Sequence, residues 1–228
     1  MLAIQSSRAA RRYLGPARVG MLKARKLCYV VPRAAAIAVA SGFCLVGSAE
    51  ASVEVKVKTS SYRISGQNGA ALLQAMTLNG PGRGAAAHFI AQTTYKVRLN
   101  FDWQKTAGSC QFANVSAVLT ITYTYPKVSS PMSADFRDRW NRFMSGVRKH
   151  EETHGRIAQE MAAAAESQLN GLSMSGDPSC QKTRAEGKRR VASVFAAYEA
   201  RQAKFDQVEH ASGGKVERLM TLLSRARN

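Results

Sequence analysis

The sequence predicts an α+β domain in which an antiparallel β meander is followed by two long helices. In the first half of the chain, runs of alternating apolar and polar residues follow one another with only one short helical segment among them. In the second half, the apolar period changes from two residues to three or four, which is typical of amphipathic helices. A chain of 228 residues is long enough for one such domain and a targeting segment.

The predicted strands lie between turn-forming residues. Valines alternate with charged residues over 53–63, which indicates a half-buried strand. A short helix is expected over 69–78, because the Asn-Gly-Pro-Gly run that follows stops a helix. Three further strand-like runs cover 87–94, 94–103 and 114–125.

Two long helices are predicted after the strands. The first begins at Ser130–Ser133 and ends at Asn170-Gly171, and the second covers about 181–207. The basic tail, 215–228, is expected to form a short solvated helix. The first helix carries one apolar stripe in steps of three and four: Phe136, Trp140, Phe143, Val147, His150, His154, Ile157 and Met161.

Residues 1–51 are predicted to be a cleaved secretory signal peptide. The first 33 residues contain eight basic side chains and no acid, and an apolar run, Ala34–Val46, precedes small residues around Ala49 and Ala51. That run is too short for a permanent transmembrane anchor. Met21 offers a second start, which would make residues 1–20 a start-site error. We therefore expect a domain over 52–214 that is periplasmic or secreted.

The net charge limits the classes of partner. Residues 1–49 hold eight of the 33 basic residues and none of the 15 acidic ones, so the formal charge without them falls from +18 to +10. This charge favours acidic partners of the cell envelope. Nucleic acid is not expected, since the sequence contains no helix-turn-helix, RNP or zinc-finger pattern.

Two of the four cysteines, Cys110 and Cys180, lie in the predicted mature domain. In an oxidising compartment, two cysteines are most simply one disulfide bond, and the alternative is a pair of free buried thiols.

The strongest chemical signal is the segment His150-Glu151-Glu152-Thr153-His154. Two histidines four residues apart share one helix face, so both imidazoles can bind a single Zn²⁺. Glu151 would lie beside the open position of the metal and accept a proton from the water that the zinc activates. His150 and His154 are therefore predicted metal ligands, and Glu151 is the predicted catalytic base.

A third protein ligand is needed, and the sequence offers several. A Gly-x-x-His continuation of the motif is absent, because Ile157 and Glu160 occupy those positions. A glutamate of the second helix, Glu186 or Glu199, or the histidine at 88 could serve. We favour His210, because it follows the second helix beside the carboxylate of Asp206, which would orient its imidazole from outside the first coordination shell.

These motifs together resemble a bacterial family of uncharacterised exported proteins described as predicted secreted zinc-dependent proteases. The similarity extends over residues 62–214 and rests on the following runs: Tyr62–Gly66, Leu78–Pro81, Ser109-Cys110, Ile121–Pro126, Arg139–Phe143, His150–His154, Ser179-Cys180 and Phe205–His210. The resemblance implies one α+β domain, a Cys110–Cys180 disulfide, zinc on His150 and His154, and a role in the site for the segment 206–210. The chain departs from the family pattern at Phe205, where tyrosine is usual, and at Ala211, where glycine is usual.

The expected function is that of an exported zinc metallopeptidase, with a peptide or protein of the cell envelope as substrate and Zn²⁺ as cofactor. Two alternatives remain open at this point. One is a zinc-stabilised envelope binding protein without turnover, and the other is a hydrolase of peptidoglycan amide bonds.

Overall fold

The computed structural model describes residues 2–6, 53–82 and 89–225. The predicted signal peptide lies outside the described residues except for a strand, β1 (Leu2–Ser6). The histidine at 88 and the last three residues of the basic tail also lie outside them. No helix in the described part of the chain combines the length and the apolar character that crossing a membrane requires.

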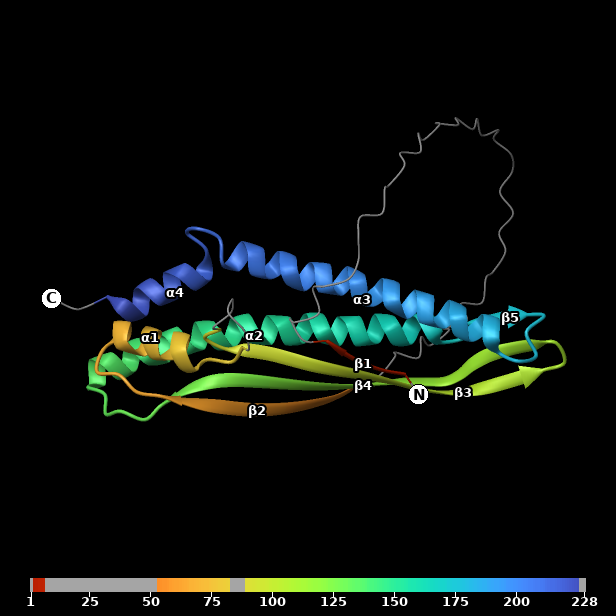
Figure 1. Cartoon of the computed structure of the whole chain (residues 1–228), viewed down its shortest axis with the longest axis horizontal. Coiled ribbons are helices and arrows are strands. Elements are labelled where there is room, and N and C mark those ends of the chain that lie inside the picture. The colour runs from red at the N-terminus through yellow and green to blue at the C-terminus, as the bar shows by residue number, and fades with distance from the viewer. Residues whose placement is uncertain (1, 7–52, 83–88, 226–228) are drawn as a thin grey trace, which may run out of the picture. The chain divides into compact units, whose positions relative to one another are not determined.

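The structure is a mixed α+β arrangement in which long helices lie over one face of a sheet (Figure 1). The other strands are β2 (Glu54–Ile64), β3 (Gln92–Thr106), β4 (Ser109–Val128) and β5 (Ser173–Ser175). The helices are α1 (Gly69–Asn79), α2 (Ala134–Leu169), α3 (Gln181–Glu209) and α4 (Lys215–Ser224). The prediction of strands followed by two long helices is thus confirmed.

β3 and β4 form one long antiparallel hairpin. Their register runs from Gln92 opposite Thr124 to Thr106 opposite Ser109, with an irregularity between Asn100 and Asp102. The prediction of two separate strands over 87–94 and 94–103 is wrong in this respect. Strand β3 begins at Gln92 and continues through residue 94 without a turn, because pairing with β4 is continuous there.

The sheet is not wholly antiparallel, which corrects the predicted meander. Its strand order is β1-β3-β4-β2, and β2 runs parallel to β4 with Glu54 opposite Val118 and Ile64 opposite Val128. The segment that contains α1 carries the chain from the end of β2 to β3, on the far side of β4. Because apolar alternation is the same in parallel and antiparallel strands, it could not reveal this pairing.

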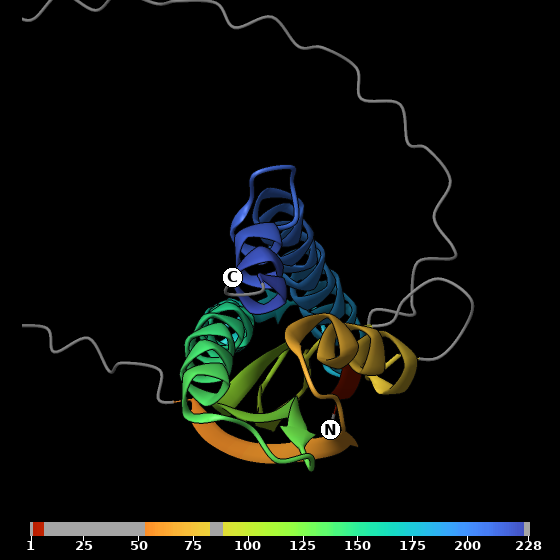
Figure 2. The ribbon, with the colours of Figure 1, turned by 90° about the vertical axis from the view of Figure 1, so that its left-hand side faces the viewer.

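Helix α2 lies over the sheet beside α3 and is shared by two apolar clusters (Figures 1 and 2). Its 36 residues extend over about 54 Å. The first half of α2 packs in a cluster with α1 and α4, to which it contributes Phe136, Phe143, Met144 and Val147. The second half packs against β3, β4 and α3, and contributes Ala158, Met161, Ala162, Ala165 and Leu169. The residues 150–154 lie between these two sets.

A disulfide bond joins Cys110 at the start of β4 to Cys180, the residue before α3, as predicted. Both cysteines are fully or almost fully buried. The bond therefore fixes the beginning of α3 to the sheet, at the end of the domain where β5 pairs with β4.

Replacing both cysteines by alanine should lower the free energy of unfolding by about 4 kcal/mol, because the bond closes a loop with a sequence separation of 70 residues. Urea unfolding of the oxidised wild type and the double variant measures this difference. Reduction of the wild type serves as the control and should lower stability similarly. A difference below about 1 kcal/mol would show that the bond adds little to the fold.

Candidate metal centre

His150 and His154 lie on adjacent turns of α2 and are both buried, with 7% and 9% of their surface exposed. Their Nε2 atoms are 3.2 Å apart. Two ring nitrogens that approach so closely in a buried place need either a shared proton or a shared cation. The i, i+4 spacing in the sequence thus brings both imidazoles to one point in space.

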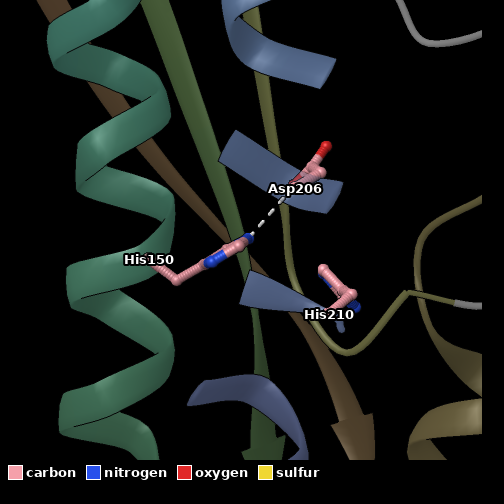
Figure 3. Close-up of side chains that lie close together, drawn as sticks. All are labelled: His150, Asp206 and His210. Atoms are coloured by element: carbon pink, nitrogen blue, oxygen red, sulfur yellow. Dashed lines mark ion pairs between the residues drawn. The ribbon is translucent and has the colours of Figure 1, made fainter. Parts of the chain in front are cut away.

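A carboxylate from α3 meets the two imidazoles at this point. Asp206 Oδ1 lies 3.0 Å from His154 Nε2 and 3.4 Å from His150 Nε2. Figure 3 shows the approach of the Asp206 side chain to His150 from the opposite helix. The two Nε2 atoms and Asp206 Oδ1 form a compact triangle, which we call the ligand triangle.

The dimensions of the ligand triangle fit a tetrahedral metal ion. Ligand atoms about 2.0–2.1 Å from a tetrahedral centre lie about 3.3–3.4 Å from one another. The three edges of the triangle measure 3.0, 3.2 and 3.4 Å. Two neutral imidazoles and one carboxylate are also a donor set of catalytic zinc sites, which keep a further position open. The residues present therefore fit zinc in both chemistry and spacing.

Two side chains of α3 lie close to the Nδ1 atoms of the histidines, on the side of each ring away from Nε2. Gln202 Oε1 lies 2.5 Å from His154 Nδ1, and the amide nitrogen of Gln202 donates a hydrogen bond of 3.0 Å to the backbone carbonyl oxygen of His154. This second bond sets the orientation of the amide, so its oxygen faces Nδ1 and can accept a hydrogen bond from an Nδ1–H group. Oε2 of the Glu209 carboxylate lies 3.5 Å from His150 Nδ1.

His210 lies at the edge of this arrangement. It is the C-cap residue directly after α3, and its ring centroid is 5.5 Å from that of His150. Potential ligand atoms of His150, Asp206 and His210 lie within 4.8 Å of one another. These three residues form a group that could hold a metal ion, so His210 as well as Asp206 stays a candidate ligand beside His150. Figure 3 shows His210 beside the other two side chains.

The ring of Phe205 closes one side of the histidine pair. It stacks on His150, with ring centroids 4.9 Å apart, and meets His154 edge to face at 5.0 Å. Phe205 therefore shields both imidazoles on the side where α2 and α3 pack together. Phenylalanine thus packs against both imidazoles at a position where the family that the chain resembles usually has tyrosine.

Glu151 is buried, with 6% of its surface exposed, and its carboxylate contacts the sheet. The hydroxyl of Thr93 on β3 donates to Glu151 Oε2 at 2.6 Å and lies 3.1 Å from the backbone oxygen of the same residue. Because Glu151 is one residue further along the helix than His150, it is turned by about 100°. The carboxylate therefore lies on the sheet side of the histidine pair.

Two tyrosines of β4 share this region with Glu151. Burial raises the pKa of the Tyr123 and Tyr125 phenols, and the nearby negative charge of Glu151 raises both further. Each phenol is consequently a protonated hydrogen-bond donor at neutral pH. Helix α2 meets the sheet here in a patch of carboxylate and hydroxyl groups.

Gly155 permits this close approach. A Cβ atom at position 155 would lie 2.0 Å from the hydroxyl oxygen of Tyr123. We expect Gly155→Ala to destabilise the domain by about 1–3 kcal/mol through overpacking. Thermal or urea unfolding measures this cost. In a Tyr123→Phe background, which removes the clashing oxygen, the same substitution should cost less than half as much, and an equal cost in both backgrounds would contradict this account.

The other predicted ligands are engaged elsewhere. The Glu186 carboxylate accepts hydrogen bonds from Arg189 and Arg190, which lower its pKa to about 2. Glu199 accepts a hydrogen bond from the hydroxyl of Tyr95. Sequence reasoning missed Gln202 and Glu209, although both lie three or four residues from Asp206 and thus on the same helix face.

The fold and the site define an α+β domain with a buried histidine and carboxylate cluster between its two long helices. The chain belongs to a bacterial family of unknown function, described as "Bacterial protein of unknown function (DUF922)", whose model matches residues 59–214. These limits include every residue of the cluster and both cysteines of the disulfide. No curated protein and no solved structure matches the chain.

Proposed function

We propose that this protein is a zinc-dependent metallopeptidase whose metal is held by His150, His154 and Asp206. The observation that carries the proposal is the ligand triangle, with edges of 3.0–3.4 Å. Zinc bound there would supply Lewis acidity and activate water at its open position. In this proposal His210, which sequence reasoning favoured as the third ligand, lies beside the triangle, with its ring centroid 5.5 Å from that of His150.

The remaining roles belong to side chains around the triangle. Gln202 and Glu209 hold the imidazoles with Nε2 directed toward Asp206. Glu151 is the base that takes a proton from water and returns it to the leaving amine. The hydroxyl of Thr93 donates a hydrogen bond to Oε2 of Glu151 and thereby holds the carboxylate in place.

A second function is favoured by the position of His210. If His210 joined the ligand triangle, four protein ligands would close the metal site, and closed sites are structural and not catalytic. The protein would then be a zinc-stabilised envelope binding protein. The ring centroids of His150 and His210 are 5.5 Å apart, and this proximity supports the second function.

Metal removal followed by restoration tests the proposal. The zinc-loaded protein should cleave members of a random peptide library, lose cleavage after dialysis against a chelator, and regain it with one equivalent of zinc. Isolated peptidoglycan forms a parallel arm, and release of cross-link amines there alone would assign the amide-hydrolase alternative. A fully zinc-loaded protein that cleaves neither substrate would favour the closed structural site.

A further inference from the structure

The face of the sheet opposite to the helices is strongly basic. On β4, Ala117, Leu119 and Ile121 are buried beneath α2, so the residues between them point to the other face. The same alternation on β3 buries Val97 and Leu99 and turns Lys96 and Arg98 outward. This opposite face of β2, β3 and β4 is named the outer sheet face below.

The strand register adds two lysines of β2 to the outer sheet face. Lys56 and Lys96 are both opposite Thr120, on either side of β4, so the three side chains form one row across the sheet. Lys58 and Thr94 are both opposite Thr122 and form the next row. Lys56, Lys58, Lys96 and Arg98 are all exposed.

Acidic side chains are scarce on this face. In the described part of this face, Glu54 lies opposite Val118 and pairs with Lys56 at 2.9 Å, and Asp102 lies further along β3 opposite Ala113. The side chains between the cations are mainly those of Thr120, Thr122 and Thr94, which are uncharged hydrogen-bonding groups. Four cations against two acids leave a net positive surface across three strands.

We propose that the outer sheet face binds the surface of an anionic membrane. The cations lie on β2 and β3, about 7 Å apart along each strand and about 9.5 Å apart across β4. Charges spread in two dimensions match a layer of lipid headgroups better than one extended polymer. The helices lie on the opposite face of the sheet, so binding leaves α2 and α3 with their histidine cluster directed away from the bilayer (Figure 1).

The binding is electrostatic and peripheral. The outer sheet face carries lysine, arginine and threonine side chains, with Val118 as its apolar member, so it supplies little surface for insertion among acyl chains. Each cation near an anionic surface contributes a factor of about five to the binding constant. The interaction should therefore weaken steeply as salt screens the charges.

Lysine footprinting on the full chain tests where the membrane lies. Vesicles of phosphatidylcholine with about one third phosphatidylglycerol should protect Lys56, Lys58 and Lys96 from acetylation. Lysines of α3, such as Lys188 and Lys204, should stay reactive, and vesicles of phosphatidylcholine alone should protect none of these. Protection of the helix lysines instead, or equal protection on both faces, would overturn the proposal. If soluble polyphosphate protected the lysines of the outer sheet face and vesicles did not, the binding partner would be an anionic polymer. That result would also overturn the proposal.

Matched charge variants give an independent readout. Replacing Lys56, Lys58, Lys96 and Arg98 by glutamine should lower the vesicle binding constant by at least about 100-fold. The control carries glutamine at four exposed helix cations, Arg137, Arg142, Lys188 and Lys204, and has the same net charge. Both chains retain the basic residues of the first 33 positions, so their ratio reports the outer sheet face. Equal binding by the two variants would contradict the proposal.

Discussion

Replacing Asp206 by alanine is expected to lower the zinc affinity by more than about 100-fold, which exceeds the usual effect of losing an outer-shell partner. Asp206 Oδ1 is 3.0 Å and 3.4 Å from the two histidine Nε2 atoms, so the substitution removes one corner of the ligand triangle. Its carboxylate would also supply negative charge to offset part of the charge of a bound Zn²⁺. Competition with a chromophoric chelator measures the affinity.

His210→Ala is the matched comparison for the third ligand. Because the ring of His210 lies 5.5 Å from that of His150, we expect its loss to lower zinc affinity by no more than about tenfold. Gln202→Ala, which removes the partner of His154 Nδ1, should lower affinity by about 10–100-fold. The reverse order, with a severe loss for His210→Ala and a mild one for Asp206→Ala, would restore His210 as the ligand.

Glu151→Gln is expected to lower kcat by about 10²–10⁴-fold, while one zinc ion per chain is retained. Glutamine preserves the size of the side chain and can still accept the hydrogen bond from Thr93, but it cannot take a proton. Steady-state cleavage of a substrate identified from the peptide library, together with metal analysis, separates chemistry from metal binding.

Glu152→Gln provides the control for Glu151. It removes an equal charge from the next residue of α2, whose side chain is exposed, and should change kcat by less than about threefold. If Glu151→Gln kept full activity, the carboxylate would not be the base. If it lost zinc as well as activity, the main role of Glu151 would be structural.

The sequence predicted those parts of the site that lie close together in the chain. His150 and His154 belong to one helical stripe, and helix geometry alone brings their imidazoles together. The cysteine pair was also predictable, because the predicted mature domain holds only two cysteines. Each of these inferences needed no knowledge of how distant segments pack.

The remaining features depend on tertiary packing. Asp206 meets the histidines because the face of α3 that carries it packs against α2. Periodicity in the sequence shows which residues share a helix face, but it does not show how two helices align with each other. We expected α3 to end near residue 207, whereas it continues to Glu209 and places Asp206 within its last turn. The parallel pairing of β2 with β4 was hidden for a similar reason, since alternation does not encode strand direction.

The most direct test of the central claim is the zinc content of the purified chain after removal of unbound metal. The ligand triangle predicts one zinc ion per chain in the wild type and none in a His150→Ala, His154→Ala double variant that retains the circular-dichroism spectrum of the fold. Equal zinc content in the two proteins, or a wild type that binds no zinc, would contradict it.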